Sequence, residues 1–280
     1  MPRSFAPYRF IHLSLYINMH GLTKAGRLFY AVAIAATGFQ QLFYGQFSRM
    51  LFPTWPIHVP GIRWIADFGS LLLIYAGGLL LFSRKILLVS LALGGCLLIL
   101  FLFSYVPYDL FIFPFPKTFG IWTNALKELA LSGGAFIIAG SATEDRENNS
   151  SLFRLLSKLI PIGRIFFSVT MISFGIMHLL YTDMISQLVP GWIPAHIFWT
   201  YLAGLSLIAS GVAIILKIGS KLAAVLLGSM ILVWLIFLHI PRAVSQPFTD
   251  RGNEVISAFS ALAFSGIAFA IAGTSVKKIK

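Results

Sequence analysis

Charged residues are scarce in this sequence. Asp, Glu, Lys and Arg together make up only 11% of its 280 residues, whereas a soluble domain has about 25%. Such a chain lacks the polar surface that keeps a folded protein in water. Because 58% of the residues are hydrophobic, a soluble enzyme, a secreted scaffold and a DNA reader are largely excluded. The composition indicates an integral membrane protein.

Cysteine is almost absent too. Cys96 is the only one, so the chain can form neither an internal disulfide nor a Cys-x-x-Cys redox motif, each of which needs two thiols. The sequence also lacks a Gly-rich phosphate loop, a nucleophile elbow, a zincin helix and histidine clusters with metal-ligand spacing. The first twenty residues contain no small-residue cleavage site, so we expect no cleaved signal peptide.

Long apolar runs are present instead. As a helix, a run of about 20 apolar residues crosses the roughly 30 Å hydrocarbon core, and no run has the ten-residue alternation of a membrane β-barrel. We therefore predict an all-α integral membrane protein with eight transmembrane helices. The predicted spans are residues 27–44, 65–82, 86–105, 121–140, 164–182, 198–216, 221–239 and 255–273.

The basic residues indicate the orientation. They are scattered in short clusters rather than gathered on one face, which argues against nucleic-acid binding. Eight spans put both termini on one side, and that side holds 15 of the 21 Lys and Arg residues. Because cytoplasmic loops retain Lys and Arg, we expect a multi-pass protein of the inner (plasma) membrane with both termini cytoplasmic.

The sequence also repeats itself. GRLFY at 26–30 recurs as GRIFF at 163–167, 137 residues later, and the same register aligns Trp55 with Trp192. This pattern predicts two tandem four-helix repeats of like orientation. The predicted segments are 1–25, a cytoplasmic N-terminal segment; 26–140, the first repeat; 141–162, a cytoplasmic linker; 163–274, the second repeat; and 275–280, a basic cytoplasmic tail.

The linker contains an amphipathic pattern. Arg154 and Lys158 are four residues apart and share a helix face, while Leu152 and Leu155 belong to the opposite one. We expect a short helix that lies on the inner leaflet and joins the two halves. A regulatory role for it stays open.

Small residues recur at helical spacing in the second span of each repeat. Gly69 with Ala76, and Gly204 with Gly211, are seven residues apart. Each pair is expected to lie on one helix face, where a neighbouring backbone can approach closely.

Two histidines lie within the predicted spans. At about 1.5 Å per residue, His178 lies roughly 21 Å and His239 roughly 27 Å across the hydrocarbon core, toward the outer side. Ionisable groups in hydrocarbon are costly and are therefore candidate functional residues. We predict an outward-facing polar pocket, with no metal. Its candidate ligand-binding residues are His178, Tyr181, Asp183, Trp192, His239 and Arg242.

Other interpretations stay open at these positions. Each histidine alone also fits an interfacial position in which its ring bonds to a carbonyl or to water, and Trp192 fits an aromatic belt as well as a stacking role. A bis-histidine haem between His178 and His239 is disfavoured by their different depths. Interfacial snorkelling explains Lys127, whereas Glu128 could face a cavity in the first half.

The first repeat differs from the second at both histidine positions. Gln41 corresponds to His178, and Tyr105 corresponds to His239. The first repeat is therefore not expected to perform the same acid-base or metal chemistry.

The second repeat resembles the DoxX family of four-span membrane proteins. The motifs that carry this resemblance are FGIMH at 174–178, VPGWIP at 189–194, HIFWTYLAG at 196–204, LHIPR at 238–242 and ALAFSG at 261–266. The resemblance covers nearly all of 163–274 and, more faintly, 26–140. It implies a four-helix unit and, for some members, a role as the membrane subunit of thiosulfate:quinone oxidoreductase or in another membrane-redox assembly.

These observations favour a DoxX-like inner-membrane protein that binds a quinone-like or other hydrophobic ligand near the outer leaflet. His178 and His239 would exchange protons or hydrogen bonds with its head group, Tyr181 would add a hydroxyl, and Arg242 would favour an anionic form. Any catalysis would be that of a subunit of a quinone-linked oxidoreductase with a redox partner protein. The alternatives are a small-solute transporter and a non-catalytic membrane assembly protein.

Overall fold

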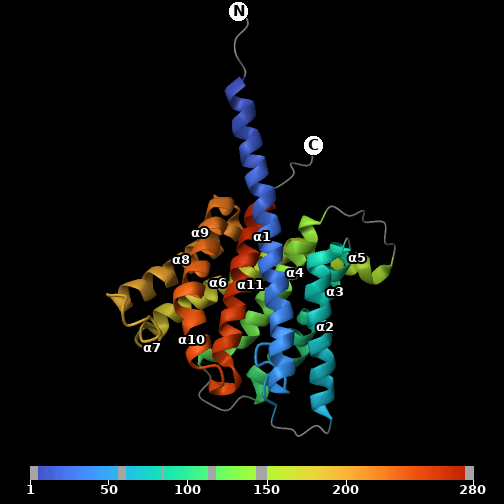
Figure 1. The fold of residues 1–280 in the computed structure, drawn as a ribbon, viewed down its shortest axis with the longest axis vertical. Helices are drawn as coiled ribbons and strands as arrows, with labels where there is room; N and C mark the ends of the chain where they lie inside the picture. The colour runs from blue at the N-terminus through green and yellow to red at the C-terminus, as the bar shows by residue number, and fades with distance from the viewer. Residues whose placement is uncertain (1–5, 56–60, 84, 113–117, 143–149, 275–280) are drawn as a thin grey trace, which may run out of the picture.

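Helices are the only regular secondary structure in the described part of the chain. The computed structural model describes residues 6–55, 61–83, 85–112, 118–142 and 150–274, with side chains from residue 21 onward. The all-α prediction is confirmed for these residues (Figure 1). The long helices are α1 (Ala6–Tyr44), α2 (Ile62–Phe82), α3 (Ile86–Leu100), α4 (Thr123–Ser141), α6 (Gly163–Leu180), α8 (His196–Leu216), α9 (Ser220–Trp234) and α11 (Asn253–Gly273). The short ones are η1 (Phe101–Tyr105), η2 (Tyr108–Ile112), η3 (Phe119–Trp122), α5 (Ser151–Ser157), η4 (Ile160–Ile162), α7 (Thr182–Ser186), η5 (Leu235–His239), α10 (Ile240–Ser245) and η6 (Thr249–Arg251).

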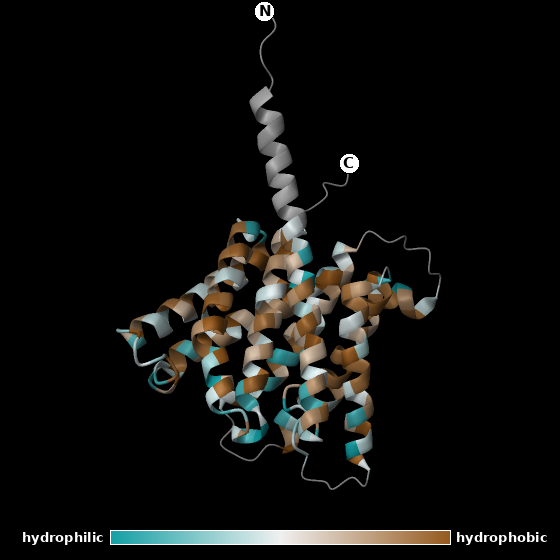
Figure 2. Cartoon of the chain, viewed as in Figure 1, coloured by the Kyte–Doolittle hydropathy of each residue, from teal (hydrophilic) through white to brown (hydrophobic). Residues whose placement is uncertain are grey.

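Six helical segments are long and apolar enough to cross a membrane. Hydrophobic residues predominate along the helices (Figure 2), and large side chains such as Phe82 and Phe103 are mostly exposed. Hydrophobic side chains on a helix exterior face lipid in a membrane protein, so the chain is an integral membrane protein in contact with the bilayer. The six segments are Ile62–Phe82, Ile86–Ile112, Ser151–Leu180, His196–Leu216, Ser220–Ser245 and Thr249–Gly273.

Helices α1 and α4 also lie in the bundle, although neither is among those six segments. The side chains of α4 are buried continuously from Ala125 to Ala139. A helix surrounded by protein needs less hydrophobicity than one that faces lipid, which explains why α4 can include Lys127 and Glu128. Helix α1 begins at Ala6 and continues without a break through residue 25, where the sequence had indicated a boundary.

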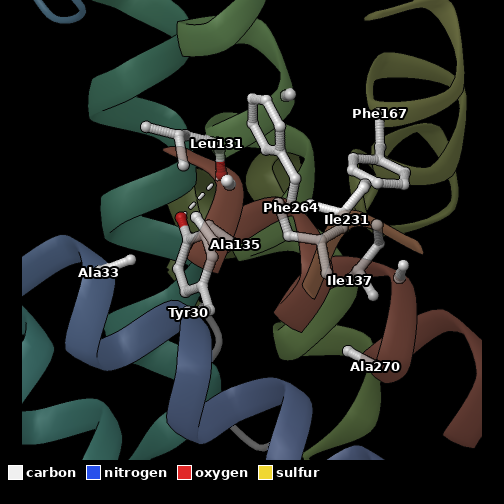
Figure 3. Packing of buried hydrophobic residues seen from close by; sticks show 14 of the residues in the cluster. Tyr30, Ala33, Leu131, Ala135, Ile137, Phe167, Ile231, Phe264 and Ala270 are labelled. Atoms are coloured by element: carbon white, nitrogen blue, oxygen red, sulfur yellow. Dashed lines mark hydrogen bonds between the residues drawn. The ribbon is translucent and has the colours of Figure 1, made fainter. Parts of the chain in front are cut away.

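The centre of the bundle is formed by α4 and α11. Helix α1 packs against α2 and α11, while α6 packs against α8 and α4. We call α1 to α4 the first half and α6 to α11 the second half. The first helix of each half therefore lies against the last helix of the other half. Figure 3 shows two contacts across this centre: the Tyr30 hydroxyl donates a hydrogen bond to the Leu131 carbonyl oxygen at 2.7 Å, and the rings of Phe167 and Phe264 meet edge to face at 6.2 Å.

Glycine allows these helices to approach so closely. A Cβ atom added at Gly26 of α1 would lie 2.5 Å from the Gly266 carbonyl oxygen of α11. One added at Gly163 of α6 would lie 2.6 Å from the Gly133 carbonyl oxygen of α4. Any larger residue would collide with backbone atoms, so both contacts require glycine.

The packing of α1 on α2 resembles that of α6 on α8. A Cβ atom at Gly77 would lie 2.7 Å from the Ala31 carbonyl oxygen, and one at Gly211 would lie 2.9 Å from the Ser168 carbonyl oxygen. The prediction of a close approach was correct for α8. It was one residue out for α2, where Gly77 rather than Ala76 makes the contact.

The third helix of each half contains a five-residue π-helix and continues beyond it. Helix α3 continues into η1, which ends at Tyr105, and α9 continues into η5, which ends at His239. Beside them, Ser132 donates a hydrogen bond to the Gly94 carbonyl oxygen at 2.8 Å, and Ser265 donates one to that of Gly228 at 2.9 Å. The two halves thus share matched contacts in all four of their long helices.

The linker region contains the short helix that its sequence pattern predicted. In α5, Leu152 and Leu155 are 65% and 59% exposed, and Arg154 lies beside them on the surface. Phe153 is buried and anchors α5 against α3 and α4. Residues 143–149 of the predicted linker and the predicted tail at 275–280 lie outside the described residues.

Adjacent glycines in α2 offer a matched test of this packing. Gly77→Ala places a Cβ against the backbone of α1, whereas Gly78 has no other atom within 4 Å of its Cβ position. Both changes gain about 1 kcal/mol in helix propensity, but overpacking at Gly77 costs about 1–3 kcal/mol. Thermal unfolding in detergent is expected to give a lower Tm for Gly77→Ala, and for Gly211→Ala, than for Gly78→Ala. Equal Tm values would contradict the close approach.

Candidate functional site

The predicted site residues lie at one end of the bundle, where α1 ends and α11 begins; we call it the distal end (lower in Figure 1). His178 is in the last turn of α6. Its Nδ1 lies 2.7 Å from the Phe174 carbonyl oxygen. A carbonyl can only accept, so Nδ1 carries the proton and Nε2 of the neutral ring is an acceptor. Gly204 of α8 makes room here, since a Cβ atom on it would lie 2.9 Å from the His178 Cβ.

His239 ends η5 and lies near the same place. It interacts electrostatically with Lys127, Glu254, Arg242 and His178. The structure therefore brings together His178, His239 and Arg242 of the predicted set. Lys127 and Glu254 join them, and we call these five residues the histidine cluster.

Arg242 is not a free cation in this cluster. Its Nε and one terminal nitrogen donate to the two carboxylate oxygens of Glu254 at 2.8 and 2.7 Å. Glu254 is in the first turn of α11, so this bidentate pair connects α10 to the centre of the bundle. The expected role of Arg242 as the group that attracts an anion is not supported, because Glu254 compensates its charge.

Lys127 supplies the uncompensated positive charge instead. It is only 9% exposed, so the expectation that it snorkels to the interface is wrong. Within the described parts of the chain, its ammonium group has no acidic partner within 4 Å. Glu254 and His239 are the groups with which it interacts electrostatically. The central position of α4 causes this burial.

Tyr181 makes a structural contact near the end of α6. Its hydroxyl oxygen accepts a hydrogen bond from the Gly120 backbone N–H at 3.2 Å. It therefore connects the end of α6 to the segment that leads into α4.

Asp183 and Trp192 lie at the periphery of the histidine cluster. Asp183 is exposed on α7 and exerts no electrostatic influence on either histidine. Trp192 is 69% exposed and packs edge to face on Phe237 of η5, with ring centroids 5.7 Å apart.

The corresponding place in the first half has a different chemistry. The Gln41 side chain donates to the Ala66 carbonyl oxygen at 2.8 Å and accepts from the Ser48 backbone N–H at 3.1 Å, which is a structural role. Glu128 is fully buried near Tyr105. The sequence had indicated that Glu128 could face a cavity, and the structure buries its side chain completely.

The two halves are also tied together by charge at the distal end. Arg49, which follows α1, lies 2.6 Å from the carboxylate of Asp250, which precedes α11. Neither residue was among the predicted site residues, since a pair 201 positions apart leaves no local pattern.

The opposite end of the bundle is basic. Hollows of about 400 and 510 Å³ occur there. Arg164, Lys217 and Lys221 line the first, and Arg154 and Lys158 of the α5 region line the second. Both are open, and neither contains a residue of the histidine cluster.

The described residues offer no group of three or more His, Cys, Asp or Glu side chains that could hold a metal ion. The cluster thus provides one fixed imidazole acceptor, a second imidazole and a buried ammonium donor. Such a set can exchange hydrogen bonds and protons with a ligand that carries hydroxyl or carbonyl groups.

The fold and this cluster define a polytopic helical membrane protein with a polar site near one end of its helices. Residues 159–240 match the DoxX family model, and this part of the chain is a DoxX domain. The matched residues run from the start of α6 through η5 and include both histidines. Neither the comparison with curated proteins nor that with solved structures found a match.

Removal of one partner of the Arg242–Glu254 pair tests its contribution. The side chains are 27% and 14% exposed, so Glu254→Gln leaves a partly buried arginine unpaired and is expected to lower stability by about 2 kcal/mol. The exposed Arg63–Asp67 pair, 3.9 Å apart with Arg63 75% exposed, is a matched control, and Asp67→Asn should change little. Thermal unfolding measures both, and equal effects would contradict the buried pair.

Proposed function

We propose that this protein is a DoxX-like inner-membrane protein that binds a quinone-like or other small hydrophobic ligand at the distal end, as part of a membrane-redox system. The observation that carries the proposal is the meeting of His178, His239 and the buried Lys127 at the ends of apolar helices. Polar groups of this kind are expensive near hydrocarbon and usually serve a ligand or a proton. The DoxX domain at residues 159–240 supports it.

The proposal includes eight spans in two fused DoxX-like units, 26–140 and 163–274, with 141–162 as the linker. Helices α1 and α4 are counted as spans because α6 and α11, at the matching positions, are parts of apolar membrane segments. The recurrence of the glycine contacts and of the π-helices at η1 and η5 supports the duplication.

The chemistry of the histidine cluster suits a quinone head group. The Lys127 ammonium can donate to a quinone carbonyl, and Nε2 of His178 can accept from a quinol hydroxyl. With Arg242 neutralised by Glu254, the charge of Lys127 would favour an anionic form of the head group.

The remaining predicted residues would lie around the head group rather than on it. Trp192 and Phe237 would contact the apolar tail, Tyr181 would hold α6 in place, and Asp183 would lie at the entrance. Since quinone reduction consumes two electrons and two protons, and the sequence has no cofactor motif, a redox partner protein would supply the electrons.

A small-solute transporter is the second candidate. The central position of α4 and α11 between two similar halves favours it, because halves of this kind can rock against each other. A non-catalytic assembly protein is the outcome if neither a ligand nor a transported solute is found.

The orientation has its own test. On a Cys96→Ala background, Gln246→Cys at the distal end and Lys217→Cys at the other end are both exposed. If the termini are cytoplasmic, an impermeant maleimide labels Gln246→Cys in intact cells and Lys217→Cys only after permeabilisation. The reverse pattern would contradict the proposed orientation.

The ligand site is tested by titration of the purified protein with a short-chain quinone and its quinol. His178→Gln and His239→Gln are each expected to raise the Kd about tenfold, which corresponds to the loss of roughly 1.4 kcal/mol. His196→Gln, the same substitution in the half-buried histidine at the start of α8, is the control and should leave the Kd unchanged. Binding that is insensitive to all three substitutions would remove the histidines from the site.

A further inference from the structure

The first half contains a buried polar group that the histidine cluster does not use. Glu128 is 0% exposed, and neither of its carboxyl oxygens has a hydrogen-bond partner among the described residues. Ser104 and Asp109 are also buried, at 5% and 2% exposure, and Ser104 Oγ and Asp109 Oδ2 likewise have no hydrogen-bond partner among the described residues. Several buried polar atoms without partners are unusual in a folded protein, and they call for a ligand, a proton or internal water.

These residues surround Tyr105. Tyr105 interacts electrostatically with Glu128, Asp109 and Arg49, and its hydroxyl donates to the Arg49 carbonyl oxygen. Ser104 and Tyr105 are the last residues of η1, the π-helix that matches η5 with His239. π-Helical turns occur frequently at functional sites.

The nearby cationic side chains, Arg49 and Lys127, interact with acidic groups other than Glu128. The Arg49 guanidinium is paired with Asp250 at 2.6 Å. Lys127 is next to Glu128 in the chain, but its electrostatic partners are Glu254 and His239 of the other half. In the first turns of α4, Lys127 thus interacts with groups of the second half and Glu128 with Tyr105 of the first half.

The other titratable groups around Glu128 do not supply a counter-charge. In the distal part of the bundle they include Tyr30 on α1, Tyr105 on η1, Tyr108 and Asp109 on η2, His178 on α6, His239 on η5, Arg242 on α10 and Glu254 on α11, and Arg242 is paired with Glu254. None of the described cationic groups lies within 4 Å of Glu128.

An ionised carboxylate in this place would be very unfavourable. Burial of an unpaired charge costs several kcal/mol even after the surroundings relax. A metal ion would need more ligands than are present, since the described residues contain no group of three or more acidic, His or Cys side chains. A bound proton removes the charge and also turns one oxygen into a donor.

We propose that Glu128 is a proton-binding site of the first half. Its neutral carboxylic acid exchanges hydrogen bonds with Ser104 and Tyr105 through internal water. Asp109 lies on η2, about one turn beyond Tyr105 toward the distal end. It is the group through which the proton exchanges with the aqueous phase. The ligand is the proton itself. The site is independent of the quinone-like ligand, because no residue is shared with the histidine cluster.

Infrared spectroscopy of the full chain in lipid nanodiscs tests this proposal. At pH 7 we expect a C=O stretching band of a protonated carboxylic acid that shifts in D₂O, is lost in Glu128→Gln and returns at a shifted frequency in Glu128→Asp. Asp109→Asn is expected to keep the band and to slow its exchange in D₂O. His178→Gln should change neither, so that failure of the ligand proposal and of this one are distinguishable.

The contradicting results are equally specific. A wild-type spectrum without a band that depends on Glu128 would mean that this carboxyl is ionised, which overturns the proposal. Unchanged exchange in Asp109→Asn would overturn the assignment of Asp109. If Glu128→Gln does not fold, wild-type protein with ¹³C-labelled glutamate gives the answer. Glu254, the other described glutamate, is held ionised by Arg242, so absence of a labelled protonated carboxyl would again refute the site.

Discussion

The close contacts between glycine backbones are the constraint on which the rest of this structure depends. Gly26 against Gly266, and Gly163 against Gly133, let the first helix of each half lie directly on the last helix of the other half. Since lipid offers little hydrophobic driving force between helices, such contacts rely on packing of small residues. They enclose α4 and α11 at the centre, away from lipid, and the two halves become one bundle rather than two.

Burial of α4 determines the polar chemistry of the protein. Lys127 and Glu128 are adjacent on this helix, yet they interact with opposite halves: Lys127 with His239 and Glu254, and Glu128 with Tyr105. The two halves, each with a π-helix directly after its third α-helix, thus place their polar residues in two different environments. One is a cationic cluster with imidazoles, suited to a polar head group, and the other is a buried carboxyl group with no described cation within 4 Å, suited to a proton.

Much of the fold was predictable from the sequence, and the features that were not predicted have a common cause. Continuous apolar runs predicted the helices, and the depths of His178 and His239 predicted one shared location, where the two imidazoles interact electrostatically. The sequence did not reveal the pairing of Arg242 with Glu254 or the burial of Lys127, because both depend on α4 and α11 being central. Hydropathy describes each helix alone, whereas the order in which helices pack depends on three-dimensional contacts such as that between Gly26 and Gly266.

We propose above that the histidine cluster binds a small hydrophobic redox ligand. The most direct measurement is an absorption spectrum of the detergent-purified protein together with mass spectrometry of its extractable small molecules, for wild type and for a variant with both His178 and His239 changed to Gln. The account predicts a quinone-like molecule in the wild-type extract that is lost from the variant. Phospholipid alone in both extracts, from colourless protein, would contradict it.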